Sequence, residues 1–293
     1  MSAQPECSLI LDDGTTIAYR VQGQGPAFVL SNGLTTNTVF WKHLSPAWAR
    51  EHTVVTWDLP GHGRSGPART PEAASIEAQA QCVARLMDEL QLERAMQIGW
   101  STGCQIVSEL LRVHASRCTG LVMLLGPGGR VLDTARLPVN GSVIELAARH
   151  APPALFNVAY RVLSRGTLLP FGDALGRALR LIGAQTLRED AQQVLAHIPT
   201  VDPASLRSML LSAAGHDARP LLANTNLPVL IVAGEIDPFA PAELVGLPLH
   251  QLARRSELLR LPAGTHTALL DHAALIAEHV ERFAARSQSE PAR

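Results

Sequence analysis

Two kinds of segment alternate along this chain. Short runs that are rich in Val, Ile and Leu, or that alternate apolar with polar residues, are typical of β-strands. We expect strands at residues 7–11, 16–22, 27–31, 53–58, 96–100, 121–125, 229–233 and 257–261. Longer segments with apolar residues every three or four positions predict helices at residues 40–50, 75–90, 104–114, 204–222, 242–254 and 269–286.

The alternation predicts an α/β fold with a mostly parallel eight-stranded sheet that is flanked by helices on both faces. It stops once, between Pro127 and about Pro203, where four helical segments rich in Leu, Ala and Arg follow one another without a strand. A Gly-Pro-Gly-Gly turn at 126–129 precedes this region, and the turn at Asp202 follows it. We therefore expect a core of residues 1–127 and 204–287, an inserted helical cap of residues 128–203, and a flexible polar tail of residues 288–293.

Composition narrows the class of protein. The chain has 293 residues, 46% of them hydrophobic, which suffices for a sizeable core. A net charge of -1 and the lack of a long basic run argue against a nucleic-acid partner. With no signal-like start and no apolar stretch of about 18 residues, we expect no membrane span and a cytoplasmic location. The four cysteines are Cys7, Cys82, Cys104 and Cys118. Their spacing matches neither a zinc-binding motif nor a Cys-x-x-Cys redox motif, so we expect reduced thiols.

The segment from Ala95 to Cys104 carries the clearest chemical signal. Gly99-Trp100-Ser101-Thr102-Gly103 follows an expected strand and precedes an expected helix. A serine on such a sharp turn must adopt a strained backbone, and glycines two residues away on either side avoid clashes there. Its hydroxyl is a poor nucleophile without a neighbouring base. The pattern makes Ser101 a candidate nucleophile that needs a base.

Four further motifs occur in a fixed order around this serine. They are Ser31-Asn32-Gly33-Leu34 after the third strand, Asp58-Leu59-Pro60-Gly61-His62-Gly63-Arg64-Ser65 after the fourth, the segment 228–238 with its Gly-Glu-Ile-Asp-Pro, and Pro262-Ala263-Gly264-Thr265-His266. Together they resemble the α/β-hydrolase fold family, in its serine-nucleophile branch with esterase- and lipase-like members. The resemblance covers nearly the whole chain outside the expected cap.

The resemblance implies a catalytic triad of Ser101, Asp237 and His266, in the chain order that this fold uses. His266 would take the proton of Ser101 and return it to the leaving group, while Asp237 would fix the imidazole tautomer and stabilise the imidazolium. The residues alone leave alternatives for these places: Glu235 as the acid, His272 or His279 as the base, and His62 as either a structural or a pocket residue.

The transition state needs hydrogen-bond donors for an oxyanion. The backbone N–H of Thr102 stands at a helix start, and the resemblance adds the N–H of Leu34. The family's commonest oxyanion loop begins His-Gly, whereas this chain has Asn32-Gly33, which leaves the shape of the loop open. Aromatic residues at helical spacing more often belong to the core than to a pocket. The candidate pocket residues are nevertheless Asn32, Trp41, Trp100, Phe156 and Tyr160.

These features predict hydrolysis of a carboxylic ester with a small to medium acyl or alcohol part through an acyl-enzyme. A thioesterase, lactonase, perhydrolase, C–C hydrolase or acyltransferase would use the same residues, and a ligand-binding receptor on this scaffold is the alternative of another class. Serine at position 101 argues against epoxide and haloalkane hydrolases, which resemble this fold but carry an aspartate nucleophile at that place. No nucleotide-loop or metal motif occurs, so no cofactor or metal is expected. The expected partner is a small-molecule ester or related acyl compound, and the oligomeric state is left open.

Overall fold

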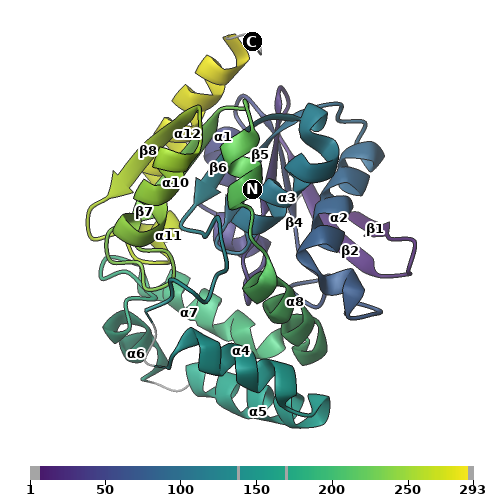
Figure 1. Ribbon diagram of the computed structural model, residues 1–293, viewed down its shortest axis with the longest axis vertical. Coiled ribbons are helices and arrows are strands. Elements are labelled where there is room, and N and C mark those ends of the chain that lie inside the picture. Colours follow the sequence, from purple (N-terminus) through teal and green to yellow (C-terminus); the bar gives the residue numbers. More distant parts are fainter. Residues whose placement is uncertain (1–6, 137–138, 169–170, 290–293) are drawn as a thin grey trace.

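An eight-stranded, mostly parallel sheet forms the centre of the protein (Figure 1). The computed structural model describes residues 7–136, 139–168 and 171–289. The strands are β1 (Cys7–Ile10), β2 (Thr16–Gln22), β3 (Ala27–Ser31), β4 (Thr53–Trp57), β5 (Ala95–Trp100), β6 (Cys118–Leu124), β7 (Val229–Gly234) and β8 (Ser256–Leu261). Their order in space is β1-β2-β4-β3-β5-β6-β7-β8, and β2 pairs antiparallel with β1 and β4 while the other pairs are parallel. The predicted sheet is confirmed.

Helices cover both faces of the sheet, as predicted. They are α1 (Ser45–Trp48), α2 (Ile76–Glu89), α3 (Gly103–His114), α8 (Pro203–Gly215), α9 (Arg219–Asn224), α10 (Leu247–Leu252), α11 (Ala268–Asp271) and α12 (Ala273–Ser289), with 3₁₀ turns η2 (Glu72–Ala74) and η3 (Ala115–Arg117). Successive strand residues point to opposite faces, so Val122 packs with α1 and α12 while its neighbour Met123 packs with α2, α3 and α8 to α10. Two buried cores result, one on each side of the sheet.

Four segments that the apolar pattern predicts as single helices are broken. Residues 40–50 form the 3₁₀ turn η1 (Thr38–Trp41) and α1, residues 204–222 form α8 and α9, residues 242–254 form the π-helical turn η6 (Ala242–Gly246) and α10, and residues 269–286 form α11 and α12. Proline stands in the first turn of α1, α9 and α10. Because proline lacks an N–H and fixes its own φ, it starts these helices instead of continuing the preceding ones.

A group of helices gathers at one end of the molecule, at the bottom of Figure 1. It consists of α4 (Gly141–His150), α5 (Pro153–Arg165), α6 (Gly172–Ala178) and α7 (Arg188–His197), with the 3₁₀ turns η4 (Gly166–Leu168) and η5 (Ile198–Thr200). These elements fall in the region that the sequence predicts to be helical, and its described residues contain no strand. At the other end of the chain, α12 runs to Ser289, so the first two residues of the predicted tail 288–293 are helical and the last four lie outside the described residues.

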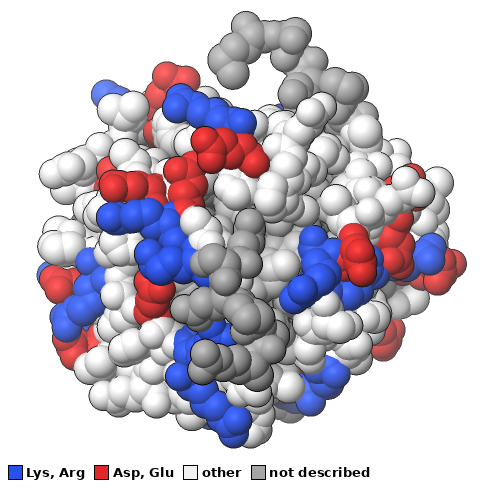
Figure 2. Space-filling model, turned by 90° about the horizontal axis from the view of Figure 1, so that it is seen from above, with Lys and Arg blue, Asp and Glu red and all other residues white. Residues whose placement is uncertain are grey.

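Charges of both signs are interspersed on the face opposite α4 to α7 (Figure 2). Arg286 pairs with Glu257 at 2.6 Å, and Arg260 pairs with Glu243 at 2.6 Å. Exposed pairs of this kind add little stability. Within the described residues, no helix combines the length and the apolar character needed to cross a bilayer.

Candidate active site

Ser101 occupies a strained turn between β5 and α3. Its φ is +54°, in the left-handed region that side chains rarely adopt, and its N–H donates to the carbonyl of Leu124 at 3.0 Å. A Cβ atom on Gly99 would lie 2.3 Å from the carbonyl oxygen of Gly103, and one on Gly103 would lie 2.2 Å from that of Ser31. The turn therefore requires glycine at both of the positions that the sequence pattern singles out.

Ser101, His266 and Asp237 form one hydrogen-bonded row. His266 Nε2 lies 2.9 Å from Ser101 Oγ, and His266 Nδ1 lies 3.0 Å from each carboxylate oxygen of Asp237. A carboxylate only accepts, so Nδ1 carries the proton and Nε2 accepts from the serine hydroxyl. Asp237 is 1% exposed and also accepts from the backbone N–H groups of Phe239 at 2.8 Å and Ala240 at 3.1 Å. The bonds thus run from the Ser101 hydroxyl through His266 to Asp237, and each donor points toward the carboxylate.

Sheet topology brings Asp237 and His266 together. β7 and β8 are parallel neighbours, so the loops that follow them leave the same edge of the sheet. The two loops also bond to each other, because the N–H of Ile236 donates to the carbonyl of Gly264 at 3.1 Å. Trp100 Nε1 donates to the carbonyl of His266 at 3.1 Å and ties the loop of His266 to the turn of Ser101.

The alternatives for the acid and the base lie elsewhere. Glu235 is exposed and pairs with Arg260 at 3.2 Å. His272 stands at the end of α11, where its N–H donates within the helix. His279 lies on α12, 3.2 Å from Arg282. None of these three side chains takes part in the row that contains Ser101.

Other reactive groups near the turn are held inert. Cys104, three residues after Ser101, is fully buried, and its thiol donates to the carbonyl of Gly99 at 3.2 Å. Burial raises the pKa of Cys104 far above its usual range, so it stays a neutral thiol. All four cysteines are free, and Cys7 is the exposed one.

Among the described residues, no group of three or more His, Cys, Asp or Glu lies close enough together to hold a metal ion.

His62 holds the loop after β3. Its ring is buried, Nδ1 donates to the carbonyl of Pro60 at 2.9 Å, and Nε2 accepts from the N–H of Thr35 at 3.1 Å. Burial lowers the pKa of His62 to about 4, so the ring is neutral at pH 7 and can accept that bond. Thr35 has φ +60° and directly follows Leu34, which with Thr102 borders the cavity described below. His62 is therefore a structural residue rather than a pocket residue.

Two predicted pocket residues lie outside the cavity, and for them the prediction is wrong. Asn32 is fully buried and its Nδ2 donates to the carbonyl of Trp57 at 2.8 Å, which joins the end of β3 to β4. Trp41 is fully buried in the core on the α1 and α12 side of the sheet. Its neighbour Phe40 faces the cavity instead and packs on Trp100 with ring centroids 4.1 Å apart.

The row opens on an apolar cavity of about 410 Å³ between the sheet edge and the helices α5 to α8. The predicted residues Trp100, Phe156 and Tyr160 border it. The Tyr160 hydroxyl donates to the carbonyl of Ile198 at 2.5 Å, and burial raises the pKa of Tyr160 to about 12, so its ring presents an apolar, uncharged surface. Lining residues that the sequence did not reveal include Leu132, Leu181, Val194, Leu206 and Phe239.

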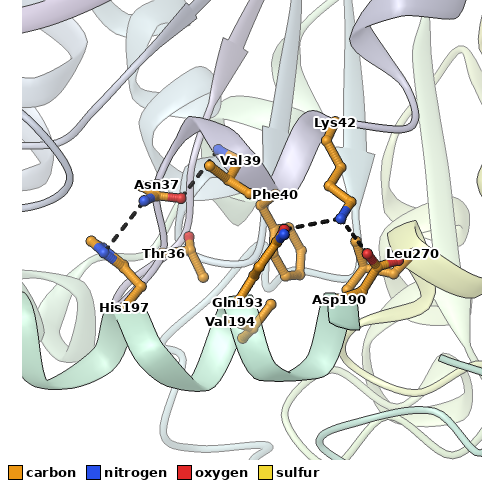
Figure 3. A pocket seen from close by; sticks show the side chains of 10 residues that line it. All are labelled: Thr36, Asn37, Val39, Phe40, Lys42, Asp190, Gln193, Val194, His197 and Leu270. Atoms are coloured by element: carbon orange, nitrogen blue, oxygen red, sulfur yellow. Dashed lines mark hydrogen bonds and ion pairs between the residues drawn. The ribbon is translucent and has the colours of Figure 1, made fainter. Parts of the chain in front are cut away.

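Polar contacts join α7 to η1 beside this cavity (Figure 3). Lys42 Nζ binds the carboxylate of Asp190 and donates to Gln193 Oε1 at 2.9 Å, and His43 Nε2 lies 2.7 Å from Asp190 Oδ2. Asp190 is 3% exposed. Burial alone would raise the pKa of Asp190, but the bonds from Lys42 and His43 outweigh it and hold the pKa below its usual value. We call these three residues the α7 latch.

Comparison with known proteins gives the family. Residues 26–273 match the family model described as alpha/beta hydrolase fold. The chain belongs to the α/β hydrolase fold family. Two curated relatives of this α/β hydrolase are named pimeloyl-[acyl-carrier protein] methyl ester esterase. The one from Aeromonas hydrophila is 28% identical over 89% of this chain and 96% of its own, and the one from Vibrio cholerae is 26% identical over 92% and 98%.

Solved structures show the same fold. An enol-lactonase from Burkholderia xenovorans matches this α/β hydrolase with a TM-score of 0.75 at 21% identity, over 95% of this chain and all of that one. A thermophilic esterase from Thermogutta terrifontis matches with a TM-score of 0.73 at 18% identity, over 97% and 99% of the two chains. At these identities the likeness concerns the fold.

Proposed function

We propose that this α/β hydrolase cleaves carboxylic esters through an acyl-enzyme formed on Ser101. The observation that carries the proposal is the row of Ser101, His266 and Asp237, which ends at an apolar cavity. An ester rather than another acyl compound is favoured because the curated relatives are named for a methyl ester.

The first half of the reaction forms the acyl-enzyme. Ser101 Oγ attacks the carbonyl carbon of the ester while its proton passes to His266 Nε2, and Asp237 stabilises the resulting imidazolium. The carbonyl oxygen becomes an oxyanion that accepts from the backbone N–H groups of Leu34 and Thr102. When the carbon–oxygen bond breaks, the leaving alkoxide takes the proton from Nε2 and departs as an alcohol.

The second half repeats these steps with water. Water gives one proton to His266 Nε2 as its oxygen attacks the acyl carbon, and the same two N–H groups hold the second oxyanion. Ser101 Oγ then leaves and regains the proton from Nε2, which releases the carboxylic acid.

We further propose that residues 128–203 act as a cap that selects the acyl part of the ester. The helices α5, α6 and α7 belong to this region and contribute Phe156, Gly176 and Val194 to the cavity. The walls they form are mostly hydrocarbon, which suits an aliphatic acyl group better than a charged one.

The test compares the wild type with Ser101→Ala on p-nitrophenyl and methyl esters of increasing chain length. Ser108→Ala is the matched control, since Ser108 is a buried serine of α3 whose hydroxyl donates to the carbonyl of Cys104. We expect Ser101→Ala to lose about 10⁴-fold or more in kcat, and Ser108→Ala to keep nearly all of it. Equal rates in the wild type and in Ser101→Ala would refute the proposal.

The same assay separates the alternatives that share this site. Faster turnover of matched thioesters or lactones would change the substrate class and leave the roles of the residues intact. A burst of one product per chain followed by a stall would instead favour a ligand-binding receptor, because such a protein has no use for the deacylation step.

A further inference from the structure

A second apolar space lies on the outer side of the helices over the cavity. It is a solvent-open groove of about 510 Å³ along α4, α5 and α8, and ten residues border it, all of them apolar. The residues that carry the following argument are Val143, Ala147, Leu155, Phe156, Ala159 and Leu210. We call this space the outer groove.

The outer groove and the catalytic cavity share two walls. Phe156 of α5 and Leu210 of α8 border both spaces, and each of these side chains is half-buried. The cavity that holds Ser101 and the outer groove therefore meet at two half-buried apolar side chains, which a change of rotamer can move.

We propose that the outer groove is the distal part of the acyl site, and that a medium- or long-chain aliphatic acyl group extends from Ser101 past Phe156 and Leu210 into it. This inference rests on the proposed ester hydrolysis and names its substrate class. The walls offer no polar side chain to a ligand, so an unsubstituted alkyl chain fits them, whereas a polar or charged chain would lose its hydration without compensation.

The exposure of the walls supports this occupant. Val143 is 54% exposed and Leu155 is 59% exposed, and together with the neighbouring alanines they form a contiguous apolar surface. Surfaces of this kind usually mark a binding site. Continuity with the catalytic cavity through two shared side chains favours the substrate itself over a second protein.

Filling the groove tests the proposal. Ala159→Trp places a large side chain in the groove from an exposed position of α5. Val162→Trp is the matched control, because Val162 lies on the same helix, is 64% exposed and is not among the residues that border the groove. The measurement is kcat/KM for p-nitrophenyl esters from acetate to dodecanoate, below their micelle concentrations.

For the wild type and Val162→Trp, we expect kcat/KM to rise about fourfold for each methylene that is buried. For Ala159→Trp, we expect wild-type values for short chains and a loss of about tenfold or more for chains that reach the groove. The length at which the two curves separate marks the passage at Phe156 and Leu210. Phe156→Ala widens that passage and should raise the ratio of dodecanoate to butyrate turnover.

Three results would overturn the proposal. The first is a curve for Ala159→Trp that coincides with that of Val162→Trp. The second is a loss of equal size at every length, acetate included, since that would show a disturbed catalytic centre. The third is self-association of the wild type that Ala159→Trp abolishes, since a second copy of the chain would then cover the groove.

A binding measurement keeps this inference separate from the proposed function. If no ester shows turnover that depends on Ser101, the proposed function fails, and methyl dodecanoate is then titrated by calorimetry into the wild type, Ala159→Trp and Val162→Trp. Binding that only Ala159→Trp loses would still support the outer groove as an alkyl site. Equal binding by all three, or none, would overturn it.

Discussion

His62 shows how a side chain outside the cavity can set the geometry inside it. Its ring joins the loop after β3 to the loop after β4, through one bond that it donates to Pro60 and one that it accepts from Thr35. Only the neutral ring with its proton on Nδ1 can make both bonds. The position of the Leu34 N–H, next to Thr35 in the chain, therefore depends on the protonation state of a residue that touches no substrate.

The pH dependence of stability follows from this ring. Burial lowers the pKa of His62 to about 4, so between pH 6.5 and 4 the unfolded chain binds a proton that the folded chain does not. The neutral ring therefore contributes its full stabilisation above pH 6.5, and the free energy of unfolding falls as the pH falls below that value. We expect the wild type to lose about 2 kcal/mol more than His62→Gln between pH 7 and pH 5, since glutamine can keep both bonds and does not titrate. Urea unfolding of both proteins at several pH values measures this, and parallel curves would contradict it.

Single residues also show what the sequence can and cannot predict. Ser101 was singled out by its glycine-flanked turn between a strand and a helix, and Asp237 and His266 by motifs that resemble the α/β-hydrolase family; the structure places the three in contact. Trp41 was mispredicted because the chain pattern does not say which of two adjacent aromatic residues turns toward a cavity, and here it is Phe40. Such choices depend on packing between segments that are distant in sequence.

At the scale of elements, the approach of α3 to β3 depends on Gly103. An alanine Cβ there would lie 2.2 Å from the carbonyl oxygen of Ser31, so strand and helix would have to separate. We expect Gly103→Ala to lower the free energy of unfolding by about 3 kcal/mol or more. Gly215→Ala, at the end of α8 with no atom within 4 Å of its Cβ, should be neutral or slightly stabilising. Thermal and urea unfolding compare the two, and similar values would count against the steric argument.

The α7 latch is a second contact between elements that can be tested. Asp190→Asn keeps the shape of the side chain but leaves Lys42 and His43 without their carboxylate, so we expect a loss of about 1 to 3 kcal/mol at pH 7. Because the folded pKa of Asp190 is lowered, this difference is present above the usual carboxyl pKa and disappears as the pH falls through the lowered value. Glu189→Gln, its exposed neighbour on α7, is the control. Urea unfolding of the wild type and the two variants at pH 7 and in acid measures the difference. Equal losses in both variants would show that the contacts of Asp190 with Lys42 and His43 do not stabilise the protein.

Element boundaries were predicted unevenly. Strand ends agree within three residues because each strand is a short apolar run between polar turns. The long helices were joined across breaks because apolar periodicity continues from α8 into α9, although the chain leaves the helix between Gly215 and Arg219. At this break the carbonyl of His216 accepts from the side chain of Gln105 on α3, which is a contact that no local pattern reveals.

Across the whole molecule, burial differs between the sheet and the helices over the site. Every residue of β5 is buried, whereas α5 has one buried residue, Ser164, and an outer surface of exposed valine and leucine. Local stability follows the number of buried contacts. Ser101 therefore follows a fully buried strand, whereas Phe156, which borders the cavity, lies on a helix with one buried residue. This division suits a site whose chemistry needs fixed distances and whose substrates differ in length.

Native-state hydrogen exchange measures that division. We expect amides of β5 and β6 to exchange only through global unfolding, and amides of α4 and α5 to exchange through local openings that cost several kcal/mol less. In Ser101→Ala, methyl dodecanoate should slow exchange in α5, where the alkyl chain would bridge Phe156 and Ala159, and should leave β6 unchanged. The same ester should have no such effect on exchange when Ala159→Trp is added. Equal protection of α5 and β5 without ligand would show that cap and core open as one unit, and selection of the acyl chain would then have to come from a rigid cavity.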